Sequence, residues 1–277
     1  MEIVLGTAQL FGRYGVAEQS VASSGDDPKD FLLLAQSLGF SAIDTAPSYF
    51  NAEEAIGGAK LSLPIHTKLE SSLNPVQSIT GSLARLRRNS VEIAYLHDPE
   101  APTKDEGAAI QRASSLIGTL TAALGASVYT TAACRAAIAN DLITVVQIPV
   151  NPLKRDVLNV AASGRTLGKK VFGRSLFGQG LLVATSGQLP TRLSHLASTT
   201  KAFHRLCQEL GRTPAEICLL WARDHPQLDG LVIGLASLQQ LRETSEALKL
   251  PPLHPSERDA VDGLDFPDPE CLDPRSW

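Results

Sequence analysis

The sequence has few of the features that mark secreted, membrane-embedded or metal-binding proteins. Its four cysteines form no CxxC pair and show no other metal-ligand spacing, which is typical of free thiols in a reducing compartment. No segment reaches the roughly 18 unbroken apolar residues that a membrane span needs. The first residues, MEIVLGTAQL, lack the basic and apolar regions of a signal peptide. We therefore expect a cytoplasmic protein with no membrane partner.

The sequence also has no excess of positive charge. The net charge of −4 and the isoelectric point near 5.9 give no broad basic surface, so the sequence does not favour nucleic acid as a partner. His195, His204, His225 and His254 show no ligand spacing, so we expect no metal site. A small molecule is the expected partner, and both a monomer and a small homo-oligomer are compatible with the sequence.

Short apolar runs alternate with longer amphipathic stretches along the whole chain, which indicates repeated βα units around a parallel sheet. Eight such runs are present, at residues 2–7, 41–45, 63–68, 91–97, 125–128, 143–150, 170–175 and 231–234. Eight strands with intervening helices predict an α/β fold, a closed (β/α)8 TIM barrel. We expect residues 1–277 to form one domain, with 251–277 a tail, rich in proline and aspartate, that wraps the barrel.

Helices are predicted between these strands. Asp27 and Pro28 form an N-cap followed by proline at the first helical position, and Gly39 ends that helix. Similar signals place the other helices near residues 51–59, 75–89, 107–122, 130–140, 154–166, 196–210, 214–224 and 237–247.

Polar residues close three consecutive strands. Asp44 ends the second, with Tyr49 in the following loop, and Lys68 and His97 end the third and fourth. Active sites of parallel barrels lie at the C-terminal ends of the strands, so we expect these four side chains to meet there. Each taken alone is also typical of a structural ion pair or of loop packing, and it is the joint pattern that indicates catalysis.

The four residue types form a coherent catalytic group. A tyrosine phenol with a pKa near 10 is a poor proton donor at neutral pH unless a cation stabilises its phenolate. Lys68 can supply that cation and Asp44 can hold it in place, while His97 can orient a carbonyl oxygen or relay a proton to it.

The sequence resembles the aldo-keto reductase family. The resemblance rests on LGTAQ at 5–9, IDTAPSYFNAEEAIG at 43–57, HTK at 66–68, YLHDP at 95–99, GAS at 125–127, VVQIPVNPL at 145–153, SLFGQGLL at 175–182 and VIGLASLQQLRE at 232–243. It implies an NAD(P)(H)-dependent oxidoreductase in which Tyr49 is the general acid or base, Asp44 and Lys68 tune it, and His97 orients the carbonyl. The similarity of RSLFGQG to bacterial members also suggests a sugar or polyol substrate.

The resemblance further implies a nicotinamide cofactor, NADP(H) or NAD(H), bound without a GxGxxG motif and without a metal. The cofactor-binding residues that it implies are Gly6, Thr7, Ser127, Gln147, Arg174, Ser175, Leu176, Gly178, Gln179, Gly180, Ser237, Gln240 and Glu243. Ser127 and Gln147 would bond the carboxamide with support from Asn151, residues 175–180 would follow the pyrophosphate, and the helix that begins near Ser237 would hold the adenosine.

Three positions depart from the family pattern. Val128 stands where an asparagine commonly assists at the carboxamide, and Arg174 stands where many members have an aromatic ring against the nicotinamide. A guanidinium there could stack on the nicotinamide, or could bond a phosphate or an acidic substrate. The segment GLASLQQL at 234–241 lacks the usual cation for a 2′-phosphate. The nearest cation, Arg242, is equally typical of an exposed helix, so both cofactors stay open.

The substrate pocket is expected to contain Phe11, Tyr14 and Phe50, with Trp277 closing it if the tail covers the barrel mouth. Loop packing is the alternative for the first three, and anchoring against the outer helices is the alternative for Trp277. The expected reaction is reversible hydride transfer to an aldehyde, ketone or sugar carbonyl. Two alternatives are a catalytically silent nicotinamide-binding regulator or subunit, and a barrel lyase or isomerase that uses Lys68 chemically.

Overall fold

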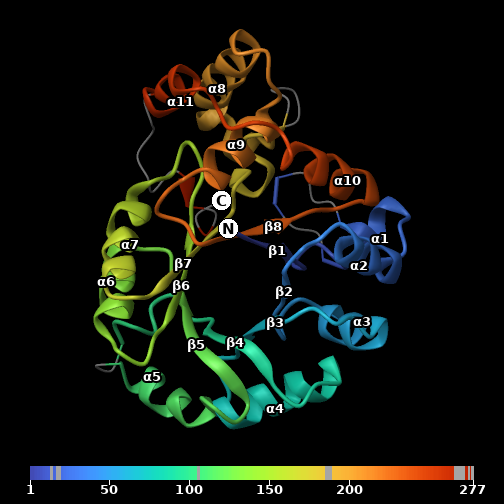
Figure 1. Cartoon of the computed structure of the whole chain (residues 1–277), viewed down its shortest axis with the longest axis vertical. Coiled ribbons are helices and arrows are strands. Elements are labelled where there is room, and N and C mark those ends of the chain that lie inside the picture. The colour runs from blue at the N-terminus through green and yellow to red at the C-terminus, as the bar shows by residue number, and fades with distance from the viewer. Residues whose placement is uncertain are drawn as a thin grey trace.

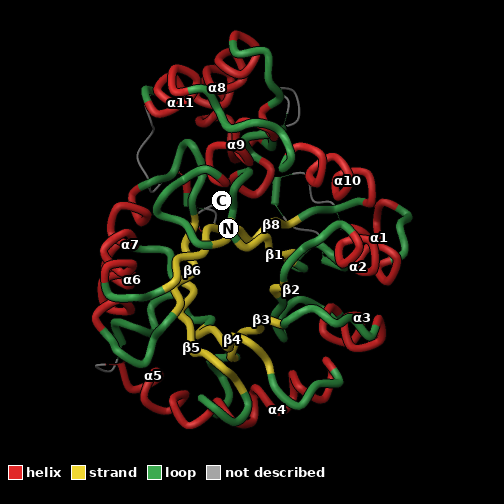
Figure 2. Tube along the Cα trace, in the orientation of Figure 1, coloured by secondary structure: helices red, strands yellow, loops and turns green. Residues whose placement is uncertain are grey.

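The structure, a computed structural model, describes residues 1–12, 15–16, 20–104, 107–184, 189–264, 272–273 and 275. Eight parallel strands form one closed barrel in which each strand pairs with the next, and β1 also pairs with β8. The strands are β1 (Glu2–Gly6), β2 (Ala42–Asp44), β3 (Ile65–Leu69), β4 (Val91–Leu96), β5 (Thr121–Ser127), β6 (Val145–Pro149), β7 (Lys170–Arg174) and β8 (Gly230–Gly234). The predicted (β/α)8 fold is confirmed (Figures 1 and 2).

Helices surround the ring of strands (Figure 2). They are α1 (Val21–Ser24), α2 (Pro28–Ser37), α3 (Ala52–Ala59), α4 (Pro75–Leu86), α5 (Ala108–Ala113), α6 (Thr131–Ala139), α7 (Asp156–Thr166), α8 (Ala197–Glu209), α9 (Pro214–Arg223), α10 (Leu238–Ala247) and α11 (Pro255–Asp262), with short 3-10 helices η2 (Ser114–Leu116), η3 (Gly178–Gly180) and η4 (Thr191–Leu196). The predicted start of α2 is confirmed, because the Asp27 carboxylate accepts from the Lys29 N–H at 2.7 Å.

The core has two parts. A large cluster of aliphatic side chains fills the space between the strands and the helices. A smaller cluster, which contains Tyr95 and Phe172, fills the inside of the barrel. These two rings fit because their neighbours are glycines: a Cβ on Gly125 would collide with the Tyr95 ring, and one on Gly230 would collide with Phe172. The barrel is therefore a packed core, and ligands can reach it only at its mouths.

The sequence prediction was wrong for residues 107–122. The helix there ends at Ala113 and continues only as η2, and β5 already begins at Thr121, four residues before the predicted strand. Gly118, at φ 78°, reverses the chain between them, and Thr121 then pairs with Val91 of β4. Pairing with β4 thus overrides the helical preference of an alanine- and leucine-rich segment.

Among the described residues, two α-helices were not predicted, the single turn α1 and α11 in the C-terminal segment. His254 caps α11 with Pro255 at the first helical position, and the Glu257 carboxylate accepts from the His254 N–H at 2.6 Å. This capping box lies within HPSE, a start signal present in the sequence. Figure 1 places α11 with α8 and α9 on one side of the barrel.

Candidate active site

The four predicted catalytic side chains come together at the C-terminal ends of β2, β3 and β4. Asp44 is the last residue of β2 and Lys68 lies near the end of β3. His97 follows β4 directly. Tyr49 lies in the loop after β2, and its ring meets the His97 ring edge-on, with the centroids 6.3 Å apart.

A buried ion pair joins two of them. The Lys68 ammonium donates to the Asp44 carboxylate at 2.5 Å and to the Thr45 carbonyl at 2.9 Å. Lys68 is 2% exposed. Burial acts to lower the pKa of Lys68, but the Asp44 and Tyr49 side chains outweigh it and raise that pKa. Lys68 is therefore a buried cation at neutral pH.

That cation faces the tyrosine. The Lys68 Nζ lies 4.8 Å from the centroid of the half-buried Tyr49 ring. A positive charge at this distance stabilises negative charge that develops on the phenol oxygen. The arrangement suits a tyrosine that gives up or takes back a proton.

His97 is electrically neutral at physiological pH. Burial is the main cause, and the charges of Lys68 and Arg174 add to it, so the pKa of His97 falls to about 4. A neutral imidazole can donate a hydrogen bond to a carbonyl oxygen without releasing its proton to it. His97 is therefore suited to orienting a substrate, and Tyr49 to transferring the proton.

The predicted carboxamide-binding residues lie beside this group. Ser127 ends β5 and donates to the Gln147 side-chain oxygen at 3.4 Å. The Gln147 amide nitrogen donates to the free oxygen of Asp44 at 2.8 Å. Asn151 donates to the Ser175 carbonyl at 3.2 Å. The sequence did not predict the contact between Gln147 and Asp44, which makes Gln147 a link between the ion pair and Ser127.

Arg174, the last residue of β7, contacts the loop that follows β5. Its guanidinium stacks on the ring of Tyr129, with the guanidinium carbon 4.0 Å from the ring centroid. It also donates to the Val128 carbonyl at 3.2 Å. Tyr129 directly follows Val128 in the loop after β5, and no spacing or motif in the sequence pairs it with Arg174.

The segment that was expected along a pyrophosphate follows Arg174. Ser175 and Gln179 have φ near 60° and 54°, and Gly178 and Gly180 are also left-handed. The Gln179 carbonyl accepts from the Val16 N–H at 2.9 Å, which ties the segment to the loop after β1. Leu176 is buried in the outer core, so only its backbone is available to a ligand.

The expected adenosine end lies at the start of α10. Ser237 is the N-cap, and its hydroxyl accepts from the Gln240 N–H at 3.1 Å. A residue that the sequence did not single out occupies the same helix end, because the Asp26 carboxylate accepts from the Leu238 N–H at 2.8 Å. Glu243, one turn further along, accepts from Gln239 on the surface.

The remaining predicted positions that the structure describes lie at the end of β1 or in the loops after β1 and β2. Thr7 donates to the Asp44 carbonyl, and Gly6 precedes it at the end of β1. Phe11 is partly buried, whereas Phe50 is 70% exposed and in the left-handed region at φ 51°. Tyr14 and Trp277 lie outside the described residues.

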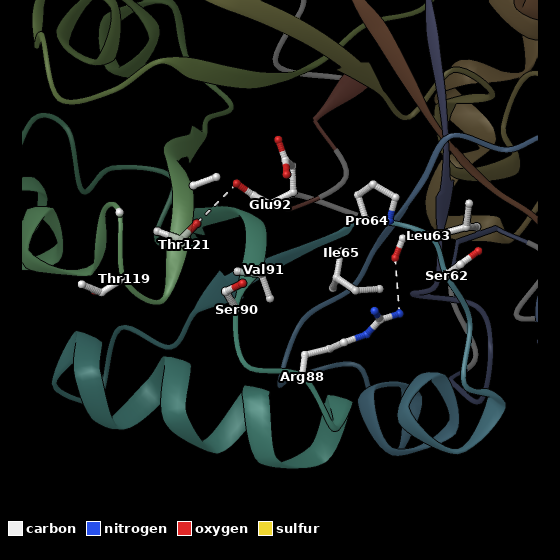
Figure 3. Close-up of a pocket in the computed structure, with 12 residues that line it drawn as sticks. Ser62, Leu63, Pro64, Ile65, Arg88, Ser90, Val91, Glu92, Thr119 and Thr121 are labelled. Carbon is white, nitrogen blue, oxygen red and sulfur yellow. Dashed lines mark hydrogen bonds between the residues drawn. The ribbon is translucent and has the colours of Figure 1, made fainter.

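A hollow of about 390 Å³ opens at the opposite end of the barrel. Figure 3 shows its wall, which is formed by the segments that lead into β3, β4 and β5. The one guanidinium in that wall, Arg88, already bonds the carbonyl oxygens of Leu61 and Leu63. This hollow lies at the N-terminal ends of the strands and contains none of the predicted catalytic residues.

Other functional groups are limited in the described part of the chain. Cys134, Cys207 and Cys218 are buried free thiols, and Cys271 lies outside the described residues. Within the described ranges, no three His, Cys, Asp or Glu side chains gather to hold a metal. None of the described helices is long and apolar enough to cross a membrane.

Comparison with known proteins identifies the family of this chain. The sequence profile of the aldo/keto reductase family matches residues 2–265. This chain belongs to the aldo/keto reductase family. The family acts on small carbonyl substrates and generally uses nicotinamide cofactors.

Solved structures support the fold of this aldo/keto reductase. The holo form of an aldo-keto reductase from Bacillus halodurans aligns with a TM-score of 0.75 at 17% identity, over 94% of this chain and 90% of that one. A glycerol dehydrogenase from Gluconobacter oxydans aligns with a TM-score of 0.69 at 20% identity, over 94% and 90% of the two chains. A search of curated proteins found no match. At these identities the similarity establishes the barrel fold alone.

Proposed function

We propose that this aldo/keto reductase reversibly reduces an aldehyde, ketone or sugar carbonyl to the alcohol with NAD(P)H, and that Tyr49 transfers the proton. One observation carries the proposal: the buried Lys68 ammonium faces the Tyr49 ring at 4.8 Å while Asp44 holds it at 2.5 Å. The nicotinamide, when bound, supplies the hydride that the carbonyl carbon accepts.

The protein's own groups then have distinct tasks. Tyr49 donates its proton to the carbonyl oxygen, and the Lys68 charge stabilises the phenolate that is left. Asp44 keeps Lys68 charged and directed at Tyr49. His97, neutral because burial and nearby cations hold its pKa near 4, donates a hydrogen bond to the same carbonyl oxygen. Reversal of these steps oxidises an alcohol.

The residues at the mouth fit a nicotinamide amide. Ser127 and Gln147 are buried polar side chains that lie opposite each other on adjacent strands. They satisfy each other only through a long hydrogen bond of 3.4 Å. An amide group placed between them would offer both a donor and an acceptor. We propose that these two side chains hold the carboxamide and that residues 175–180 border the pyrophosphate.

The N-terminal end of α10, where we expect the adenosine to bind, favours NAD(H) over NADP(H). A 2′-phosphate bound at a helix N-terminus meets unpaired N–H groups. Here the Asp26 carboxylate already takes the Leu238 N–H at 2.8 Å, with Ser24 bonded to the same oxygen. The added negative charge would repel a 2′-phosphate there.

The decisive experiment compares Tyr49→Phe with the wild type. We expect kcat on a panel of aldehydes and ketones to fall at least about 100-fold, while the dissociation constants for NADH and NADPH, measured by fluorescence titration, stay the same. Tyr95→Phe is the matched control, because it removes a phenol hydroxyl from a fully buried ring inside the packed barrel. Wild-type turnover by Tyr49→Phe would refute the assigned role.

Two alternatives give different results in the same assays. A silent nicotinamide-binding regulator would bind cofactor and turn over no carbonyl. A lyase or isomerase that uses Lys68 would form a Schiff base that borohydride traps. The burial of Lys68 and its short bond to Asp44 weigh against the second alternative, because a Schiff base needs an accessible, neutral amine.

A further inference from the structure

Arg174 spans the catalytic mouth of the barrel. It leaves the end of β7, yet one terminal nitrogen donates to the carbonyl of Val128, just beyond the end of β5. The guanidinium therefore extends past the end of β6, which lies between those strands. The Tyr129 ring supports one face of the guanidinium at 4.0 Å.

Neighbouring cations differ from Arg174 in their partners. Lys68 is paired with Asp44 and Lys104 with Asp98. Arg275 stacks on the same Tyr129 ring at 4.4 Å and is paired with a carboxylate of the tail, that of Asp273.

Arg174 has only uncharged partners among the described residues: the ring of Tyr129, the Val128 carbonyl and a long contact of 3.4 Å with the Ser175 hydroxyl. A partly buried guanidinium of this kind holds its charge in place and keeps N–H donors for an anion.

The charge acts where the substrate binds. Together with burial and Lys68, it lowers the pKa of His97, the residue proposed to hold the carbonyl. Most of its contacts lie on the His97 side of the mouth, on the loop after β5, and only the long contact with Ser175 points toward the segment 175–180. An anion bound to Arg174 would therefore lie beside a carbonyl held by His97 and Tyr49.

We propose that Arg174 binds an anionic group of the substrate, so that this enzyme prefers carbonyl compounds that also carry a carboxylate. The inference rests on the proposed carbonyl reduction. A guanidinium presents parallel N–H donors that match the two oxygens of a carboxylate. A phosphate ester and the cofactor pyrophosphate also present paired anionic oxygens. The experiments must therefore decide whether the anion bound by Arg174 belongs to the substrate or to the cofactor.

The test pairs a charged aldehyde with a neutral one of nearly the same shape, 4-carboxybenzaldehyde and methyl 4-formylbenzoate. For the wild type we expect kcat/KM to be about 10- to 100-fold higher for the carboxylate, mainly through KM. Arg174→Met should remove this preference, because it should lower kcat/KM for the carboxylate at least about tenfold more than for the ester. Arg174→Lys should retain part of it, because lysine keeps the charge but not the paired donors.

Arg275→Met is the matched control. Arg275 is the other cation on the Tyr129 ring, and Asp273 already balances its charge. We expect it to change the preference by less than about twofold. A wild-type preference that Arg174→Met leaves intact, or the absence of any wild-type preference, would overturn the proposal.

Binding measurements separate the two sources of the anion. Calorimetry of 4-(hydroxymethyl)benzoate and its methyl ester on protein saturated with oxidised cofactor should show tighter binding of the carboxylate, lost in Arg174→Met. Weaker binding of the cofactor itself in that variant, with equal losses for both aldehydes, would assign Arg174 to the pyrophosphate and overturn the inference.

The same experiments distinguish this inference from the proposed function. Turnover of the neutral ester by the wild type supports carbonyl reduction whatever Arg174 does. If neither aldehyde is reduced, the proposed function fails. The calorimetric comparison of carboxylate and ester then still decides whether Arg174 is an anion site.

Discussion

At the scale of single residues, Asp26 has a role that its sequence neighbours do not reveal. It lies in the turn before α2, yet its carboxylate bonds the first turn of α10, 212 positions away. Carboxylates stabilise helix N-termini through the helix dipole. The same placement opposes any second anion at that helix end, including a 2′-phosphate.

Asp26→Asn tests this opposition. The amide oxygen can still accept from Leu238, but the charge is gone, so we expect NADPH to bind about fivefold more tightly, which corresponds to about 1 kcal/mol, with NADH unchanged. Fluorescence titration with each cofactor measures the ratio. Asp27→Asn is the control, because Asp27 caps α2 instead. A ratio that does not move in Asp26→Asn would contradict the assignment.

The sequence predicted residues at the ends of strands better than it predicted contacts across the barrel. Asp44, Lys68 and His97 could be placed near one another because the ends of successive parallel strands share one mouth. The bond from Gln147 to Asp44 joins residues 103 positions apart, and it depends on side-chain directions that no spacing encodes. The stacking of Arg174 on Tyr129 likewise depends on side-chain directions and could not be predicted from spacing.

At the scale of elements, α3 and α4 touch through a glycine. A Cβ on Gly57 would overlap the Arg85 carbonyl at the end of α4, whereas one on Gly58 would meet nothing within 4 Å. The Glu53 carboxylate of α3 accepts from Arg85 at 2.8 Å and from Thr67 of β3 at 2.7 Å. The helix pair is thus fixed by one close backbone approach and one shared carboxylate.

Adjacent substitutions should therefore have opposite effects on stability. We expect Gly57→Ala to lower the free energy of unfolding by about 1 to 3 kcal/mol, because the helices must separate. Gly58→Ala should raise it by about 0.5 to 1 kcal/mol, because alanine loses less backbone entropy in a helix. Urea denaturation of the two variants gives both values. Equal effects would show that α3 and α4 are not closely packed at Gly57.

Prediction of the elements was least successful where local and long-range preferences disagree. Most of the helix and strand positions could be predicted from capping residues and apolar periodicity. The segment 107–122 could not, because its composition favours a helix while its pairing partner in β4 requires a strand from Thr121. The capping box of α11 is present in the sequence. The prolines and aspartates around it favour an irregular tail, and for that reason the short helix was not predicted.

At the scale of the whole molecule, the barrel interior contains an ionisable group that is not at the catalytic mouth. His66 is 1% exposed, lies among the rings of Tyr95 and Phe172, and has a ring nitrogen, Nδ1, without a hydrogen-bond partner in the described structure. Burial lowers its pKa to about 4, against the opposing effect of Asp44.

Acid should destabilise the fold through this group. The unfolded chain binds a proton at His66 below about pH 6.5, whereas the folded chain does so only near pH 4, so the free energy of unfolding falls as the pH falls through that window. The largest contribution is about 3 kcal/mol. We expect His66→Leu, compared by urea denaturation at pH 7 and pH 5, to lose less stability than the wild type. An equal loss would refute the assignment.

The closed barrel itself was predictable because eight apolar runs separated by amphipathic stretches have few other arrangements. The packing inside the barrel was not predictable, since the matches of Gly125 to Tyr95 and of Gly230 to Phe172 depend on the register between strands. Register follows from side-chain packing that the pattern of apolar residues does not specify.

The hollow at the N-terminal ends of the strands provides a way to attach the enzyme to a surface. Ser90, on its wall, is exposed (Figure 3). The described cysteines are buried, with the pKa raised to about 12 for Cys134 and about 11 for Cys207, which makes them slow to react with maleimides. A cysteine introduced at Ser90, with Cys271 changed to serine, would therefore tether an electrode or bead with every molecule's catalytic mouth turned toward solution.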